Sequence, residues 1–199
     1  IDSGPTVLTM RWVFEELFAA GGAALEDRVR LHALDVLARH AWGPDERLDL
    51  FADRKTSADA IAAFAGPREG RAYLAFCEDA RRVFETVERP VMLSPRPDMM
   101  AVAFRAGFSF DRVKAFTTLW RAIGRHFRDE RLTQLFARYS TYVGSSPYLA
   151  PGTLMLIAHV EQEGVWAVGG GMYRLAEAMV ELADELGVRL LPATSVRRI

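Results

Sequence analysis

The chain has 199 residues, of which 50% are hydrophobic and 26% are charged, and its formal net charge is −1. This is the composition of a globular protein with one large domain or two small ones, and it gives no electrostatic reason to expect a nucleic-acid partner. The single cysteine, Cys77, excludes a disulfide within the chain and a cysteine-rich metal site. No stretch approaches the roughly 18 consecutive apolar residues of a membrane-spanning helix.

The first quarter of the chain is predicted to hold an extended segment, one helix and a strand pair. Residues 1–7 are expected to be extended, and residues 10–20 carry apolar side chains at helical spacing. Within residues 29–53, two apolar runs flank the turn signal GPDE, which predicts an antiparallel hairpin. Leu48 and Leu50 alternate with polar residues, so they are expected on one face of the second strand.

From residue 55 onward the sequence is mostly helical. The run TSADAIAAFAG has Thr56 three residues before Asp59, a variant of the capping box, and stops at Gly66. A long helix with one apolar stripe follows and closes at Pro90. Further helices are expected at 97–106, 110–127, 129–142, 147–162 and 173–186, and strands at 165–168 and 188–191.

These elements predict an α+β fold in which a helical layer covers a small mixed or antiparallel sheet. The strand-helix-strand order after residue 164 is typical of a parallel sheet. The chain starts without methionine and stops within a predicted strand. We therefore expect an internal fragment of a longer protein.

The triple glycine in GVWAVGGGMYRLAEAM invites comparison with a dinucleotide-binding loop. Gly169 and Gly171 supply G-x-G, but Arg174 occupies the position of the third glycine, which permits close helix-strand packing in that fingerprint. The next predicted strand also ends in LLPAT, without the acidic residue that would bind the ribose. The pattern argues against a phosphate cradle, and favours either a flexible turn or a loop that brings backbone close to a ligand held elsewhere.

Two polar residues are candidates for chemistry. Asp129 stands at a predicted helix start, where a carboxylate favours the helix dipole, and a catalytic role is about equally consistent with the sequence. His159 lies on an apolar helix and is expected to be a core or cleft histidine, because no histidine pair has zinc-ligand spacing.

Two other stretches have unusual apolar character. Tyr139, Tyr142 and Tyr148 surround a Gly-Ser-Ser-Pro break between helices, which is typical of a cleft lining or of a plain helix corner. Residues 90–108 join apolar side chains with Arg96 and Arg105, a pattern that suits a membrane interface or a packed helix.

Three stretches of the sequence resemble the bacterial carotenoid desaturases. They are DSGPTVLTM, RLTQLFARYSTYVGSSPYLAPGTLMLIAHVEQ and GVWAVGGGMYRLAEAMVELADELGVRLLPATSVRRI. These are phytoene dehydrogenase-like flavoenzymes of the amine oxidase superfamily, and the hydroxyneurosporene or methoxyneurosporene desaturase branch is the most similar. The resemblance implies the substrate domain of a flavoprotein with an FAD/NAD(P)-binding fold. Residues 1–9 would be the exit strand from the flavin domain, 10–168 the substrate-binding domain, and 169–199 the returning helix and strand.

The resemblance also implies roles for individual residues. FAD would be approached by Gly4, Pro5, Thr6, Gly170, Gly171, Met172 and Val196. A carotenoid, acyclic and hydroxylated or methoxylated, would contact Tyr139, Tyr142, Tyr148, His159 and Trp166. Asp129 matches a carboxylate proposed to help proton transfer, although Thr133 stands where the family commonly has its partner arginine.

The implied reaction removes two hydrogens from a carbon-carbon bond, with the flavin as electron sink. Because a carotenoid must be drawn from the bilayer, the resemblance favours membrane contact through 90–108 and a cytoplasmic location peripheral to the inner membrane. Two alternatives stay open, namely an amine oxidase-like flavoenzyme with a polar substrate and a non-enzymatic helical interaction domain. We expect the fragment alone to retain no FAD, because the phosphate-binding glycines would lie upstream.

Overall fold

The computed structural model describes residues 4, 6–107, 114 and 116–198, which divide into two compact units. Ile1–Leu34 and Gly164–Ile199 form the first unit, and Asp35–Glu163 form the second. Each unit combines helices with a two-stranded antiparallel sheet, so the predicted α+β class is confirmed. No helix in the described ranges is both long and apolar enough to cross a membrane.

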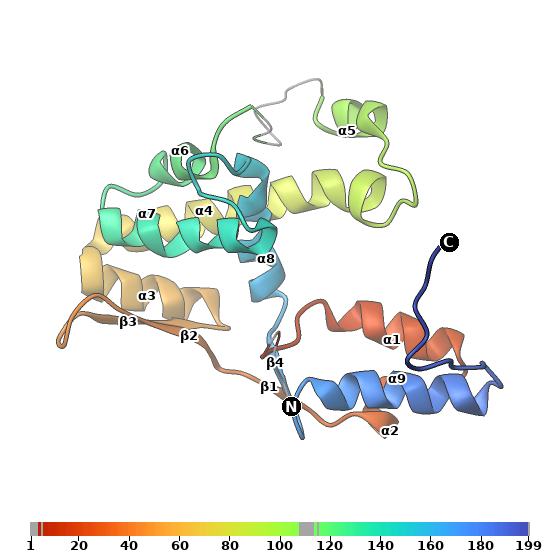
Figure 1. The fold of residues 1–199 in the computed structure, drawn as a ribbon. Helices are drawn as coiled ribbons and strands as arrows, with labels where there is room; N and C mark the ends of the chain where they lie inside the picture. Colours follow the sequence, from red (N-terminus) through yellow and green to blue (C-terminus); the bar gives the residue numbers. More distant parts are fainter. Residues whose placement is uncertain (1–3, 5, 108–113, 115, 199) are drawn as a thin grey trace. The chain divides into compact units, whose positions relative to one another are not determined.

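The first unit is built around a ladder between segments far apart in the sequence. Strand β1 (Leu31–Ala33) pairs antiparallel with β4 (Trp166–Val168), and Leu8 exchanges two backbone hydrogen bonds of 2.8 Å with Trp166. Helices complete the unit, and they are α1 (Arg11–Ala20), α2 (Leu25–Arg28) and α9 (Tyr173–Glu185). Figure 1 shows α9, in blue, beside α1 and α2.

One face of α9 supplies much of the core of this unit. Leu175, Ala178 and Leu182 recur at helical spacing and are buried with Phe18 of α1 and Leu25 of α2. Burying a large apolar side chain stabilises a fold by about 1.5–3 kcal/mol. This stripe therefore fixes the rotation of α9 about its own axis.

The second unit places a hairpin against helices. Strands β2 (Val36–Ala41) and β3 (Arg47–Phe51) form the hairpin, which lies along α3 in Figure 1. The α-helices of this unit are α3 (Arg54–Ala65), α4 (Pro67–Val87), α5 (Met99–Arg105), α6 (Leu119–Gly124), α7 (Glu130–Ala137) and α8 (Ile157–Gln162). A π-helical turn spans Glu88–Met92, and 3₁₀ turns span Arg138–Val143 and Gly152–Leu156.

Aromatic side chains of α4 and α7 hold the second unit together. Phe76 of α4 lies 4.8 Å from Phe136 of α7 between ring centroids, and Phe136 stacks on Phe127 at 5.2 Å. Tyr73, one turn before Phe76, also stacks on Phe136 at 5.8 Å. The apolar stripe predicted for the long helix is confirmed, since its members are buried, and Cys77 is fully buried beside them.

Several sequence predictions are confirmed. The hairpin turns where GPDE predicts it, and Leu48 and Leu50 are both only 3% exposed on one face of β3. The helix predicted at 10–20 is α1, and the one predicted at 173–186 is α9. Gly66, with a φ of 100°, ends α3 as expected, because that conformation strains any other residue.

The start of α3 was predicted incorrectly. Asp53, and not Thr56, is its N-cap, since the Asp53 carboxylate accepts a hydrogen bond of 2.7 Å from the Thr56 backbone N–H. The Thr56 hydroxyl donates to the same oxygen at 2.7 Å, so the threonine supports the cap. A carboxylate favours the positive end of the helix dipole, which explains why the helix begins at Arg54.

The helices predicted at 110–127, 129–142 and 147–162 are shorter than expected. Thr118 caps α6, so helix begins only at Leu119; residues 110–113 and 115 lie outside the described part of the chain. After α7 the chain tightens into a 3₁₀ turn that ends at Gly144, which has a left-handed φ of 59°.

The parallel sheet predicted after residue 164 is wrong. β4 pairs antiparallel with β1, and residues 188–191 form no strand in the described chain. A strand needs a neighbouring strand to accept its backbone hydrogen bonds. Residues 188–191 have no such neighbour among the described residues, so their alternating apolar pattern alone does not make a strand.

Candidate functional site

The triple glycine forms a tight turn between β4 and α9. The Gly171 N–H donates to the Val168 carbonyl at 2.9 Å, and Gly170 and Gly171 have φ values of 85° and 93°. Gly169 donates to the Arg30 carbonyl at 2.8 Å, and a Cβ there would lie 3.2 Å from that oxygen. The glycines are therefore required by backbone conformation and by close approach, which agrees with the turn interpretation.

An open concavity of about 400 Å³ lies beside this turn, and its lining is mostly polar. Gly170 and the side chains of Arg30, His32 and Arg174 face it. Arg174 is bound to Glu181 at 2.7 Å, whereas Arg30 and His32 form no ion pair within the described residues. The carboxylates of Glu26 and Asp27 line the same concavity, so its lining carries groups of both charges around the glycine backbone.

The other predicted cofactor residues of this unit are spread along its surface. Gly4 and Thr6 are exposed, Val196 is 73% exposed, and Pro5 lies outside the described residues. Met172 packs against the core beside the turn, and Trp166 is half-buried in β4. These residues do not form a closed pocket by themselves.

In the second unit, a partly buried ion pair lies at the predicted tyrosine cluster. Glu161 of α8 accepts from the Arg138 guanidinium at 2.7 and 2.8 Å and from the Tyr139 hydroxyl at 2.8 Å. Tyr139 is 1% exposed, and its burial holds its pKa well above the ordinary value. Tyr139 therefore remains a neutral donor to Glu161.

A small cavity adjoins this cluster. It has a volume of about 10 Å³, which is the lower limit for one water molecule, and Tyr139, Glu161 and Gln162 line it together with Tyr73. The Gln162 amide contacts the Tyr73 hydroxyl at 3.4 Å. This cavity is too small to hold a polyene.

The remaining predicted substrate residues differ in exposure. Tyr142 is 61% exposed, and Tyr148 is 59% exposed with its ring 4.9 Å from that of Trp120. His159 is half-buried, with its ring edge against Phe84 at 4.9 Å, and burial lowers its pKa. Tyr142 and Tyr148 thus offer accessible aromatic surface, whereas Tyr139 does not.

Asp129 is the N-cap of α7. Its Oδ1 accepts from the backbone N–H of Arg131 at 2.9 Å, and its Oδ2 accepts from the Arg131 guanidinium at 2.7 Å. These hydrogen bonds lower the pKa of the Asp129 carboxyl, so it is ionised at neutral pH. Asp129 is thus paired with Arg131, two residues on, whereas the position at which the resemblance led us to expect an arginine is Thr133.

Sequence reasoning missed Glu161, Arg138 and Arg131. Glu161 and Arg138 are separated by 23 residues, so no local spacing signals their contact. Both residues lie next to apolar stretches. A charged residue beside an otherwise apolar helix face was the one sequence signal that could have indicated a paired charge.

No family model matches the chain. Among curated proteins, it is 50% identical over 95% of its length to the hydroxyneurosporene desaturase of Rubrivivax gelatinosus and 45% identical over 100% to that of Cereibacter sphaeroides. It is 32% identical over 94% to the lycopene-forming phytoene desaturase of Pseudescherichia vulneris. The chain is homologous to the carotenoid desaturases. It covers 37%, 41% and 38% of these relatives, so it spans about two fifths of their length.

Proposed function

We propose that this chain is the substrate-binding portion of an FAD-dependent carotenoid desaturase that acts on an acyclic, hydroxylated or methoxylated carotenoid. The observation that supports it most is the 50% identity over 95% of the chain to a protein named hydroxyneurosporene desaturase.

The bound flavin would supply the hydride acceptor. Removal of two hydrogens also releases a proton, and the ionised Asp129 carboxylate is the proposed acceptor. Arg131 would hold that carboxylate in place through two hydrogen bonds to its oxygens. Tyr142 and Tyr148 would contact the polyene, while Tyr139 would act indirectly by positioning Glu161.

On the cofactor side, we propose that Gly170, Gly171 and Met172 line the FAD site together with Arg30, and that Gly4, Pro5, Thr6 and Val196 complete it. Arg30 would donate to a phosphate or ring carbonyl, since it forms no ion pair within the described residues, and Glu26 and Asp27 line the same concavity. The boundaries 1–9, 10–168 and 169–199 remain the proposed division between flavin and substrate domains.

A second apolar face on α9 supports the proposal that residues 169–199 belong to a larger nucleotide-binding domain. Tyr173 and Val180 are 59% and 51% exposed, and with Ala176 they form the apolar side of a shallow concavity of about 310 Å³ whose other side is lined by Arg174, Glu177 and Glu181. They are spaced by three to four residues, as on a helix face that packs. A helix with two apolar faces suits a position between two layers.

The test uses the full-length protein to which this chain belongs. It should purify with FAD and convert a hydroxylated acyclic carotenoid to a more conjugated product with red-shifted absorption. Oxidation of amines with no change in any carotenoid would instead support the amine oxidase-like alternative, and absence of bound flavin would favour the non-enzymatic one. The isolated 199-residue chain is expected to retain no FAD, and a flavin absorbance spectrum from it would contradict that expectation.

The Asp129 assignment has its own test. Asp129→Asn in the full-length protein should lower turnover at every pH at which the protein is folded, while flavin content stays normal. Arg131→Gln should raise the pKa of Asp129 and move the acidic limb of the pH-rate profile upward. Unchanged turnover in Asp129→Asn would remove Asp129 from the chemistry.

A further inference from the structure

We propose that two copies of this protein associate through antiparallel pairing of their β3 strands, which joins the two hairpins into one continuous sheet. Strands β2 and β3 form a two-stranded sheet, so within the described residues no strand pairs with the side of β3 that lies away from β2. We call this side, at Arg47 and Asp49, the β3 edge. An unpaired strand edge presents N–H and C=O groups that can pair with another chain.

The direction of the β3 backbone follows from its ladder with β2. In an antiparallel pair, successive residues point their N–H and C=O groups alternately toward the partner strand and away from it. The Trp42 N–H donates to the Glu46 carbonyl at 2.9 Å, so the backbone of Glu46 points toward β2. The register is regular from there through Asp49. Arg47 and Asp49 therefore point their backbone groups away from β2, at the β3 edge.

Phe51 gives independent support for this direction, because it is the next residue in the same alternation. Its N–H donates to the Ser57 hydroxyl at 2.8 Å, and that hydroxyl donates to the Phe51 carbonyl at 2.9 Å. Ser57 thus satisfies the backbone of Phe51 and closes the edge at that end. The free part of the β3 edge is therefore the stretch from Arg47 to Asp49.

An open groove of about 610 Å³ lies along the β3 edge. Residues 47–49 line one side of it, and Ala60, Ala63 and Phe64 of α3 line the other. Consecutive side chains of a strand point to opposite faces of the sheet, so a groove that touches all three positions lies at the edge of the strand. The two alanines leave room for another backbone to approach β3.

Charge favours a second copy of this protein as the occupant. Arg47 and Asp49 are the positions with free backbone groups, and they carry opposite charges. If two β3 strands pair antiparallel with their Leu48 residues opposite each other, Arg47 of each copy lies opposite Asp49 of the other. This register pairs the free backbone groups of both residues across a two-fold axis. A shift by two residues would instead place two arginines or two aspartates opposite each other.

The side chains are already arranged for this contact. The Asp49 carboxylate accepts two hydrogen bonds of 2.7 Å from the Arg39 guanidinium, which hold it in a fixed position and lower its pKa. Arg47 is exposed and forms no ion pair with another described residue. A wholly acidic or wholly apolar strand would leave one or both charges of the edge without a partner. Because the pairing needs neither flavin nor carotenoid, the inference does not depend on the proposed reaction.

The experiment is analytical ultracentrifugation of the full-length protein to which this chain belongs, across a range of protein concentrations. The wild type should show a reversible dimer. Arg47→Glu and Asp49→Lys should each raise the dissociation constant of the dimer at least about tenfold, because each places like charges opposite each other twice. An equimolar mixture of the two variants should restore the dimer, since every substituted charge then lies opposite one of unlike sign.

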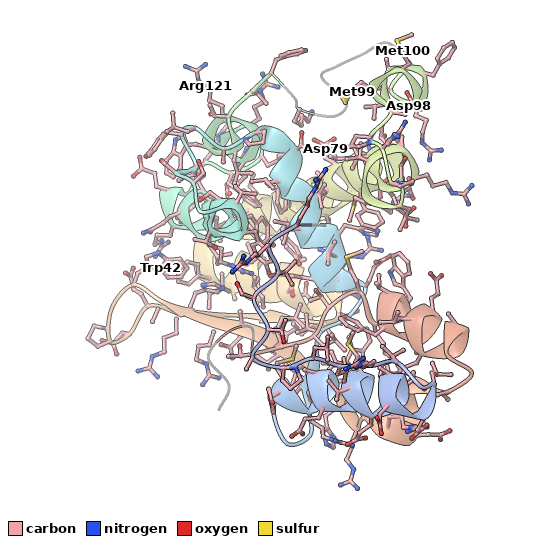
Figure 2. The ribbon with its side chains drawn as sticks, turned by 45° about the vertical axis from the view of Figure 1, so that its right-hand side comes forward. Trp42, Asp79, Asp98, Met99, Met100 and Arg121 are labelled. Atoms are coloured by element: carbon pink, nitrogen blue, oxygen red, sulfur yellow. The ribbon has the colours of Figure 1, made fainter. Side chains whose placement is uncertain are left out.

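The matched control is Arg121→Glu. Arg121 is an exposed arginine of α6, and Figure 2 shows it apart from Trp42 at the hairpin turn. This variant should change the dissociation constant by less than about twofold. A full-length protein that stays monomeric would overturn the proposal, including the case in which the 199-residue chain dimerises because another segment covers the edge in the longer protein. A mixture of folded variants that fails to restore the dimer, or an equal loss in Arg121→Glu, would overturn it as well.

Cysteine cross-linking tests the register directly. In the 199-residue chain the only native cysteine is Cys77, which is fully buried. Residues that face each other in a hydrogen-bonded antiparallel pair have Cα atoms about 5.5 Å apart, within the range of a disulfide. Arg47→Cys chains mixed with Asp49→Cys chains should therefore form a disulfide-linked dimer several-fold faster than either variant alone. Equal rates in the three samples would contradict the proposed register.

Discussion

Removal of the Glu161 carboxylate should be among the most destabilising single changes in the second unit. The side chain of Glu161 is 12% exposed, and it is the acceptor for both Arg138 and Tyr139. In Glu161→Ala, the Arg138 guanidinium loses its only carboxylate within the described residues, and the Tyr139 hydroxyl is left buried without an acceptor.

The magnitude follows from these two losses. Removing one member of a buried ion pair costs about 3–5 kcal/mol, and an unsatisfied buried hydroxyl costs about 1–3 kcal/mol. Because the Arg138 side chain is 30% exposed, water relieves part of its penalty. We expect the free energy of unfolding to fall by about 3 kcal/mol, which lowers Tm by roughly 6–12 °C in a chain of this size.

The assay is urea denaturation of the 199-residue chain, monitored by circular dichroism. The dependence of the unfolding free energy on urea concentration should be the same in all variants if they unfold by the same reaction. Glu161→Gln keeps an acceptor for Tyr139 and should cost less than Glu161→Ala. Glu163→Ala is the matched control, because Glu163 is 38% exposed and 3.4 Å from His159, and it should change stability by less than about 0.5 kcal/mol. If Glu161→Ala falls within that same range, the Glu161–Arg138 pair does not stabilise the unit.

Three further outcomes are expected for this chain. Gly171→Ala should lower the free energy of unfolding by at least about 1 kcal/mol, because the φ of Gly171 is 93°. Gly124 lies in a helix with open space around it, so Gly124→Ala should be neutral or stabilising. Equal urea midpoints for the two variants would contradict this expectation. Burial lowers the pKa values of His40 and His159, so the free energy of unfolding should be highest above pH 6.5 and should decrease as the pH falls below that value. The variant His40→Gln/His159→Gln should show a smaller decrease between pH 7.5 and 5.5. Asp129→Asn should reduce the rise in the free energy of unfolding between pH 3 and pH 6. The pKa of the Asp129 carboxyl is lowered in the fold, so its ionised form stabilises the fold above the ordinary pKa of 3.8, and this stabilisation is lost in acid. Acid titrations of the wild-type chain and of the variant would show the difference.

The sequence predicted those elements whose signals are local. The hairpin at GPDE needed only turn residues and alternating leucines, and the long helix needed only its apolar stripe. Gly66 could be assigned as a helix stop because few residues other than glycine accept its backbone conformation. The family resemblance was likewise carried by continuous motifs, and the comparisons confirm it.

The errors share a different physical origin. Residues 188–191 have a strand-like pattern, but pairing depends on a neighbouring strand that the pattern cannot reveal. The N-cap of α3 is Asp53 because its carboxylate accepts from the Thr56 N–H, and Thr56 itself lies within the first turn of the helix.

The sequence by itself determined the hairpin, the amphipathic helices, the need for glycine at the turn after β4 and the relationship to carotenoid desaturases. Only the tertiary structure decided that Glu161 binds Arg138 and Tyr139, that Asp129 pairs with Arg131, and that the apolar residues of α5 face outward. Local patterns follow from the geometry of one segment, whereas burial and charge pairing depend on which distant segments meet when the chain folds.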